Sequence, residues 1–186
     1  MDTRTALLNS AEKACRSRGY NGFSYADLSR EVGIRKASIH HHFPAKTDLA
    51  YSVLERYTDA FFAQLEEIEA TERTGGTMLK AYIEAYRTAL DGGESVCLCV
   101  AFSAGRENLS EPVLIKLNLF HMDSISWLKQ VFKRGQQDGS IASIANVTDE
   151  ASACLATMEG AQLMARAAKV PGLFDHAVRG LLKRII

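Results

Sequence analysis

The sequence has no apolar run long enough to span a bilayer, and no alternation of apolar and polar residues that would predict a β-strand. It also has no low-complexity tract and no internal repeat. The first residues lead into an amphipathic pattern rather than a signal peptide. At 186 residues the chain can bury a real core in one or two small domains. We therefore expect an all-α protein of the cytoplasm with no membrane segment.

Cysteine is scarce, and the spacing of the four cysteines matches no metal site. Cys97 and Cys99 are separated by one residue, which is too tight for the usual C-x-x-C redox or zinc pattern. Reduced thiols are expected. A phosphate-cradling glycine loop, a G-x-S-x-G elbow and an H-E-x-x-H motif are all missing. The sequence therefore predicts no metal, no cofactor and no enzymatic activity.

Proline occurs three times, and each proline marks a predicted helix boundary: Pro44 ends one helix, while Pro112 and Pro171 each open another. Apolar residues recur at threes and fours along most of the chain, which predicts nine helices. Among these are helices over residues 3–18, 78–90 and 95–107. Thr47 and Thr148 are the expected N-caps of two further helices, and the run 74–76, which contains two glycines, is expected to separate helices.

The net charge of zero conceals an asymmetry. Residues 1–50 contain eight basic and five acidic side chains, a net charge of +3, so the remainder carries −3. A basic amino-terminal part on an acidic body suits a protein that binds a polyanion at one end.

Residues 24–49 are the most informative stretch of the chain. Ser24 is a good N-cap, and Asp27 three positions later can complete a capping box. Gly33 stands where the chain must turn sharply between two short helices, and the second of these runs from about Arg35 to Phe43. A pair of short helices joined by a tight turn is the arrangement that places one helix in the DNA major groove.

The second short helix has two different faces. At about 100° per residue, Ile39 and Phe43 fall on one side, whereas Lys36, Ala37, His40 and His41 fall on the other. One face is therefore expected to pack inside the protein, and the other to present hydrogen-bond donors outward.

These residues resemble the DNA-binding domain of the TetR family of bacterial transcriptional repressors. The resemblance rests on a capping Ser, a Gly-Ile turn, small and basic residues at the start of the recognition helix, an aromatic run ending in Phe, and a Lys that opens the next helix. Here those places are held by Ser24, Gly33, Ile34, Lys36, Ala37, Ser38, His40, His41, His42, Phe43 and Lys46. The upstream residues 11–23 match too. The family usually has Tyr at the place of His40 and often another aromatic residue at that of His42.

The resemblance implies a DNA-binding domain over residues 1–46 and an effector-binding and dimerisation domain over residues 47–186. It further implies a homodimer on a palindromic operator in double-stranded DNA, released by a small-molecule effector. An activator that uses the same DNA-binding residues is the alternative. The DNA-contacting residues carried over are Ser24, Tyr25, Arg35, Lys36, Ala37, Ser38, His40, His41, His42 and Lys46.

The chemistry of these side chains predicts their roles. Lys36 is a long donor that can reach guanine O6 or N7, and Ala37 leaves room for a thymine methyl group. Ser24, the three histidines and Lys46 are expected to hold phosphates, whereas Ser38 and Arg35 fit either role. Arg35 is alternatively a solvated surface charge. The three adjacent histidines point about 100° apart on a helix, so they do not converge on one metal ion.

The predicted effector site lies on the middle helices, where aromatic and polar residues interrupt the apolar stripes; ordinary core packing explains most of them equally well. His121 is either an interior histidine or a polar anchor for the ligand. The candidates are Phe61, Phe62, Tyr82, Tyr86, Phe102, Phe120, His121, Trp127, Met158 and Gln162.

Two further hypotheses concern regulation and assembly. Cys97 and Cys99 are expected at the start of a helix, where the dipole favours thiolate, and some TetR-like regulators with a similar Cys-Leu segment resemble sensors of electrophiles or oxidants. Structural packing is the alternative for both thiols. Small residues along 151–168 favour close helix packing, so the last two helices form either the dimer interface or an ordinary intrachain contact.

Overall fold

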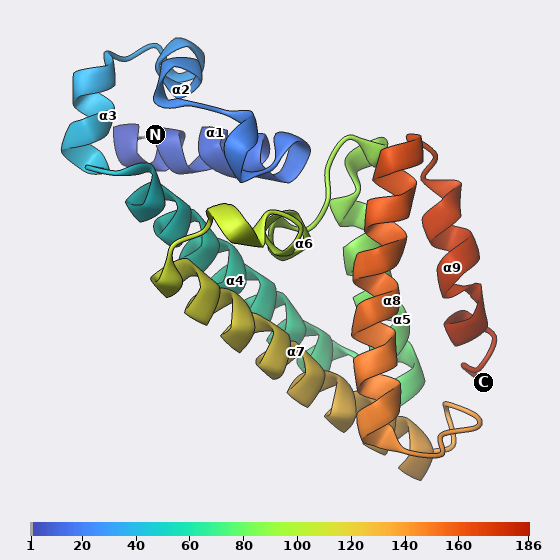
Figure 1. Ribbon diagram of the computed structural model, residues 1–186. Coiled ribbons are helices and arrows are strands. Elements are labelled where there is room, and N and C mark those ends of the chain that lie inside the picture. Colours follow the sequence, from blue (N-terminus) through green and yellow to red (C-terminus); the bar gives the residue numbers. More distant parts are fainter. Residues whose placement is uncertain (1) are drawn as a thin grey trace. The chain divides into compact units, whose positions relative to one another are not determined.

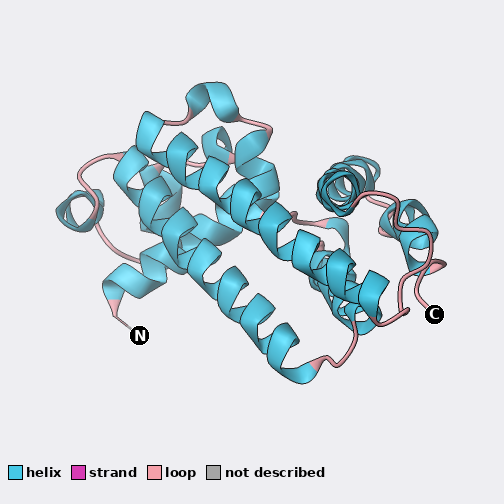
Figure 2. Ribbon diagram, turned by 90° about the horizontal axis from the view of Figure 1, so that it is seen from below, coloured by secondary structure: helices cyan, strands magenta, loops and turns pink. Residues whose placement is uncertain are grey.

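The structure, a computed structural model, describes residues 2–186 of the chain. Over these residues it contains nine α-helices and three short 3-10 helices, which confirms the all-α prediction and its helix count (Figures 1 and 2). No strand occurs in that range; Ile141 and Ile185 form one isolated antiparallel bridge.

The helices divide into two compact units. Unit 1 contains the chain up to Asp59 together with Leu98–Leu119, and unit 2 contains Ala60–Cys97 and Phe120–Ile186. This division follows packing and falls inside α4 (Lys46–Thr71) and α7 (Glu111–Gln137). The functional division at residue 46 stays a prediction.

Unit 1 is built from the amino-terminal helices and one short helix from the middle of the chain. Its elements are α1 (Thr3–Arg18), α2 (Tyr25–Val32), α3 (Lys36–His42), the first part of α4, α6 (Leu98–Ser103) and the first part of α7. The Asp2 carboxylate caps α1 by accepting a 2.9 Å hydrogen bond from the Thr5 amide, and Gly19, at φ 77°, ends the helix as predicted.

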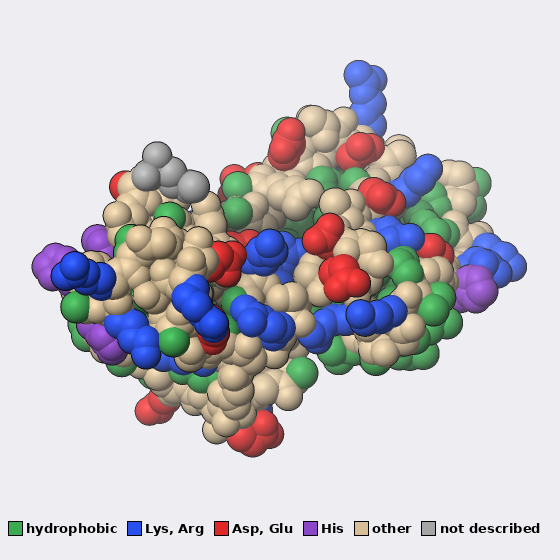
Figure 3. All heavy atoms as spheres, turned by 90° about the horizontal axis from the view of Figure 1, so that it is seen from above, with side chains coloured by type: hydrophobic (Ala, Val, Ile, Leu, Met, Phe, Trp, Pro, Cys, Tyr) green, Lys and Arg blue, Asp and Glu red, His purple; other side chains and the backbone are tan. Residues whose placement is uncertain are grey.

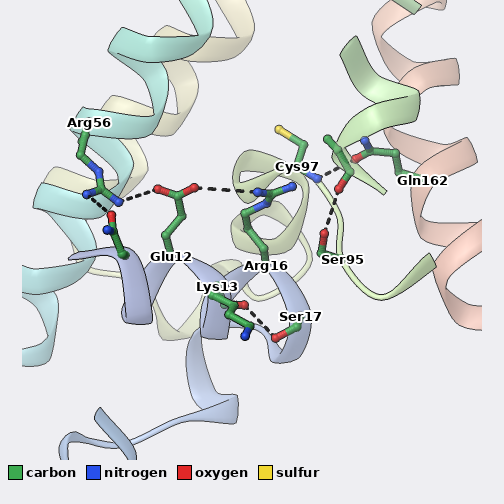
Figure 4. Close-up of polar contacts among 10 residues, drawn as sticks. Glu12, Lys13, Arg16, Ser17, Arg56, Ser95, Cys97 and Gln162 are labelled. Atoms are coloured by element: carbon green, nitrogen blue, oxygen red, sulfur yellow. Dashed lines mark hydrogen bonds and ion pairs between the residues drawn. The ribbon is translucent and has the colours of Figure 1, made fainter. Parts of the chain in front are cut away.

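A polar network ties α1 to α4 inside unit 1 (Figure 4). The Arg56 guanidinium donates to Glu12 and to Asn9, both at 2.7 Å, and Arg16 approaches the same Glu12 at 3.8 Å. Tyr20, just after α1, and Phe102 of α6 meet edge to face, with ring centres 6.2 Å apart. These contacts fix α1, which packs against α2, to α4 and α6.

Unit 2 contains the remainder of α4 and α7 together with α5 (Gly75–Ala89), α8 (Val147–Ala168) and α9 (Gly172–Leu182). Helix α5 starts at Gly75, three residues before Met78, where the sequence pattern predicts its start. Gly75 and Gly76 do not separate helices but form the buried first turn of α5. Their amides donate to Asp138 and Ser140, at 2.9 and 2.7 Å.

Gly75 is required here because backbone approaches backbone. A Cβ added to it would lie 2.2 Å from the Gly135 amide nitrogen of α7. A contact between residues sixty positions apart leaves no trace in the local pattern, which explains the misplaced boundary.

Three other predicted boundaries differ in smaller ways. The helix predicted over 95–107 is the shorter α6, followed by a 3-10 turn over Arg106–Asn108. Thr47 lies inside α4, and the Asp48 carboxylate accepts from the Ala45 amide just before that helix. Asn146 rather than Thr148 caps α8, by accepting from the Thr148 amide. At α8 the amide side chain of Asn146 takes the capping position, whereas at α4 the carboxylate of Asp48, inside the helix, binds the amide of the residue before it.

Candidate nucleic-acid interface and effector region

The turn between α2 and α3 has the geometry that the sequence predicts. Ser24 and Asp27 form the expected capping box, in which the Asp27 carboxylate accepts from the Ser24 amide at 2.8 Å. Arg30 pairs with the same carboxylate. These hydrogen bonds, first among them that from the Ser24 hydroxyl, lower the pKa of Asp27 to about 2. Gly33 ends α2 in the left-handed conformation at φ 75°.

The two faces of α3 are separated as expected. Ile39 is fully buried and Phe43, directly after the helix, is nearly so. The side chains of Lys36, Ala37 and Ser38 are exposed. The Tyr25 hydroxyl donates to the Phe43 carbonyl at 2.9 Å and so ties α2 to the end of α3. Tyr25 therefore holds α3 in place in this structure, besides being a predicted DNA contact.

The three histidines differ in their surroundings. His40 Nδ1 lies 3.1 Å from the Pro44 carbonyl oxygen, and its ring packs edge to face on Tyr25 at 4.9 Å. His41 is exposed and His42 partly so, with their rings 5.6 Å apart. His40 thus makes the intramolecular contacts of an aromatic residue while its edge remains exposed.

Lys46 is only partly exposed, whereas a lysine that binds a phosphate is expected to be accessible. Its ammonium donates to the Phe23 carbonyl at 2.6 Å, and lies 4.6 Å from the centre of the Tyr20 ring and 4.2 Å from that of Phe23. Burial lowers the pKa of this ammonium. A phosphate contact by Lys46 therefore stays a prediction, and the observed contacts join α4 to the segment between α1 and α2.

Basic and histidine side chains gather on the surface at the α3 end of unit 1. Figure 3 shows blue and purple side chains together at the left edge of the view, the edge at which Figure 1 places α3. Ser24, Arg35, Lys36, His40 and His41 are all exposed. The arrangement offers hydrogen-bond donors on one convex face, which suits contact with phosphates and base edges.

In unit 2 the structure brings most of the predicted effector residues together. Six rings make one continuous set of contacts, with neighbouring centres 5.1–6.3 Å apart; we name it the ring cluster, and it contains Phe61, Phe62, Tyr82, Tyr86, Phe120 and Trp127. Phe102 does not join this cluster, because its ring lies in unit 1 against Tyr20; a role for it in effector binding stays a prediction.

Gln162 and His121 complete the polar surroundings. The Gln162 amide oxygen accepts from the Cys97 backbone amide at 2.8 Å (Figure 4). The Gln162 amide nitrogen donates to the Tyr86 carbonyl at 2.6 Å. His121 Nε2 lies 3.1 Å from the Glu159 carboxylate, and that hydrogen bond raises the pKa of His121. Sequence reasoning missed Glu159, because its partner is 38 residues away on another helix.

The two candidate thiols are buried: Cys97 is 2% exposed and Cys99 is fully buried. Cys97 directly precedes α6, which has only six residues, and Cys99 lies within it. All four cysteines lie outside disulfide bonds. The environment is that of packed side chains rather than of an exposed reactive thiol.

An open hollow of about 720 Å³ also lies in unit 2, lined by Glu69, Met78, Gln130, Lys133, Arg134 and Gln137. It contains none of the predicted effector residues. Five of its six lining residues are polar or charged, and Met78 is the apolar one.

The exposed face of α8 is apolar and built largely of small residues. Leu163 and Met164 are 39% and 60% exposed, and a Cβ added to Gly160 would meet nothing within 4 Å. Ala153, Ala156 and Ala167 are exposed at matching helical positions.

Within residues 2–186, no helix is long and apolar enough to cross a bilayer.

Comparisons with known proteins agree with the geometry of α2 and α3. Residues 7–53 match the family described as bacterial regulatory proteins, tetR family. A TetR family transcriptional regulator from Agrobacterium tumefaciens is 33% identical, with a TM-score of 0.92 over 98% of this chain and 96% of that chain.

The Escherichia coli K12 transcriptional repressor NemR is 28% identical over 171 residues, which cover 89% of this chain and 84% of NemR. The structure of E. coli NemR in its reduced form has a TM-score of 0.83 at 24% identity, over 100% of this chain and 98% of that one. At that identity the structural likeness concerns the fold alone.

Proposed function

The chain belongs to the TetR family of DNA-binding transcriptional regulators, and we propose that it is a repressor released from its operator by a small molecule. Members of this family are regulators and not enzymes. The observation that carries this proposal is the exposed donor face of α3, held rigidly by Ile39, Phe43 and the Tyr25 hydroxyl. Repression is supported by the likeness to a relative named as a transcriptional repressor.

Lys36 is the proposed base-reading residue, beside Ala37 as a thymine-methyl contact. Ser24, Tyr25, His40, His41, His42 and Lys46 are proposed to contact phosphates, while Arg35 and Ser38 fit either role. Lys36→Ala is expected to weaken binding to the cognate site by about 1–3 kcal/mol and to relax base preference at one position. Lys80→Ala, which removes an exposed lysine from unit 2, is the matched control.

Genomic selection of bound fragments, followed by footprinting, measures both the site and the base preference. Equal affinity and equal base preference of wild type and Lys36→Ala would remove this lysine from the interface. Turnover of a substrate by the purified protein would contradict the assignment as a regulator.

We propose a homodimer formed through α8 and α9. The support is the exposed apolar face of α8, where Gly160 and its alanine neighbours permit close approach of a second helix. A two-fold axis would present two copies of α3 to successive major grooves, about 34–36 Å apart, so the operator should be palindromic.

Gly160→Trp tests this interface, because Gly160 is exposed and a Cβ added there meets nothing within 4 Å, so the side chain starts from an open surface of α8. Sedimentation equilibrium is expected to show a dimer for the wild type and a folded monomer for the variant. Thr88→Trp, at an exposed position of α5, is the control expected to remain dimeric. A dimeric Gly160→Trp protein would exclude this face.

Effector control is proposed to work by linkage. A ligand that binds one conformation of the dimer more tightly lowers DNA affinity by the difference between its affinities for the two conformations. The ring cluster is the proposed effector region, with Met158, Gln162 and His121 beside it. A reporter assay next to the footprinted operator decides between repression and activation through the same α3.

Thiol sensing through Cys97 is the second candidate. The favouring observation is that the Cys97 amide and the Tyr86 carbonyl share the Gln162 side chain, so a modified Cys97 would disturb contacts to α5 and α8. Burial of both thiols opposes it. Cys97→Ser is expected to abolish a response to hydrogen peroxide if this thiol is the sensor, and an unchanged response removes the hypothesis. Cys99→Ser serves as the comparison.

A further inference from the structure

The two tyrosines of the ring cluster in unit 2 are closed to solvent, yet each carries a polar hydroxyl. Tyr82 is fully buried and Tyr86 is 1% exposed. The Tyr82 ring stacks on Trp127, with centres 5.4 Å apart and planes 26° apart, and the two tyrosine rings are 5.1 Å apart. Phe61 packs against both tyrosines and against Phe120.

Within the described residues, three polar atoms of the cluster have no hydrogen-bond partner outside it: the hydroxyls of Tyr82 and Tyr86 and the Trp127 indole nitrogen. The two hydroxyls interact with each other. When one of them donates to the other, one hydroxyl proton and the indole N–H remain unused. A buried polar group without a partner costs about 1–3 kcal/mol, so such a group calls for an explanation.

The unused groups are donors, and they are neutral. Burial raises the pKa of both tyrosines well above the ordinary value, so each keeps its proton at neutral pH. Indole nitrogen donates and does not accept. A ligand that carries a hydrogen-bond acceptor therefore meets unused donors in the cluster.

Unit 2 offers no compensating charge for an ionic ligand at this place. His121 and Glu159 already pair with each other at 3.1 Å, and Gln162 uses both ends of its amide on backbone groups. The cation–π contacts found over residues 2–186 all lie in unit 1, on Tyr20, Phe23, Phe43 and Tyr57. A buried charge without a partner is strongly unfavourable.

We propose that the effector is an uncharged, flat aromatic molecule carrying a hydrogen-bond acceptor, such as an aryl ketone, which inserts between the rings of Tyr82, Tyr86 and Trp127. This inference rests on the proposed effector control and names the chemistry of the ligand. Offset or edge-to-face packing on the surrounding rings supplies the apolar contact, and the acceptor takes the hydroxyl or indole proton. The rings must separate to admit the ligand, which gives it a means of changing the positions of α5 and α7.

The chain contains one tryptophan, so its own fluorescence reports on this site. The full-length protein is titrated with acetophenone, with ethylbenzene, which lacks the acceptor, and with benzoate, which adds a negative charge. Acetophenone is expected to quench Trp127 emission saturably. Ethylbenzene, which loses the hydrogen bond, is expected to bind about fivefold more weakly, and benzoate more weakly still because its buried charge has no partner. Equal affinity for acetophenone and ethylbenzene would overturn the proposal, as would the absence of saturable quenching by acetophenone.

Tyr82→Phe and Tyr86→Phe remove only the hydroxyls and preserve the rings. One lost hydrogen bond is expected to weaken acetophenone binding about fivefold, which corresponds to about 1 kcal/mol. The ligand-free variants are expected to stay folded with melting temperatures close to that of the wild type, because each keeps the packed ring and loses only one hydroxyl. Tyr51→Phe, in unit 1, is the matched control with unchanged affinity. Unchanged affinity in both cluster variants would contradict a role of the hydroxyls.

DNA binding measured in parallel separates this proposal from the proposed function. Saturable quenching by acetophenone that leaves operator affinity unchanged supports the ligand chemistry and contradicts effector control through this site. Release from the operator by benzoate, with no effect of acetophenone, leaves effector control standing and overturns the ligand chemistry.

Discussion

Lys46→Met tests two roles of Lys46. Its ammonium either stabilises unit 1 through its contacts with Phe23 and Tyr20, or leaves these contacts to bind a DNA phosphate. Methionine keeps much of the packing of the methylene groups but removes the ammonium, and with it the hydrogen bond to Phe23 and the two ring contacts. A charged hydrogen bond is worth about 1.5–3 kcal/mol, and each cation–π contact near the surface about 0.5–1 kcal/mol. The terms share one ammonium and are not additive.

Since Lys46 is partly exposed, solvent weakens each contact. We expect the free energy of unfolding to fall by about 2 kcal/mol, which corresponds to a decrease in Tm of about 4–8 °C for a chain of this length. Urea unfolding followed by circular dichroism at fixed protein concentration measures the change. Lys36→Met, at an exposed position of α3, is expected to change stability by less than about 0.5 kcal/mol.

The dependence of DNA binding on salt gives the second measurement. If the ammonium leaves Phe23 to contact a phosphate in the complex, Lys46→Met flattens the plot of log affinity against log salt by about one. If it remains at Phe23, the slope is unchanged and the stability loss is the main effect. A variant as stable as the wild type would refute the energetic role assigned to these contacts.

Three further predictions concern packing and pH. Gly75→Ala should cost at least about 1–3 kcal/mol in urea unfolding, because the added Cβ overlaps the backbone at Gly135, whereas Gly172→Ala has open space and should be nearly neutral. Nuclear magnetic resonance titration should place the pKa of the Asp27 carboxyl at about 2; its contribution to stability is therefore present above the unfolded value of 3.8 and is lost as pH falls through about 2. A midpoint near 3.8 would contradict the capping role. The pKa of His121 should lie above 6.5 and drop in Glu159→Gln, so the stability from this pair is present below pH 6.5 and is lost as pH rises through the folded pKa. An unchanged midpoint in Glu159→Gln would exclude the pairing.

Much of the candidate interface could be predicted because its determinants are local. The capping box of Ser24 and Asp27, the left-handed Gly33 and the inward position of Ile39 each depend on residues within a few positions along the chain. Helical periodicity then decides which side chains of α3 face outward. The family resemblance is concentrated in the same residues.

For the proposed effector region, the sequence could predict only which types of residue take part. Aromatic residues on the middle helices are visible in the sequence, and most of them meet in the ring cluster. Nothing in the local pattern distinguishes Phe102, which packs in unit 1, from Phe120, which belongs to the cluster. Only the packing of the neighbouring helices shows that the buried tyrosine hydroxyls have no hydrogen-bond partner among the described residues outside the ring cluster.

The sequence by itself determined the helical class, most helix ends and the outward face of α3, because helix formation and capping involve groups no more than about four residues apart. Tertiary structure alone decided that Lys46 turns toward Phe23, that Gly75 meets Gly135 and that His121 pairs with Glu159. These contacts join residues 23 or more positions apart, and their partners are selected by the packing of whole helices rather than by any spacing along the chain.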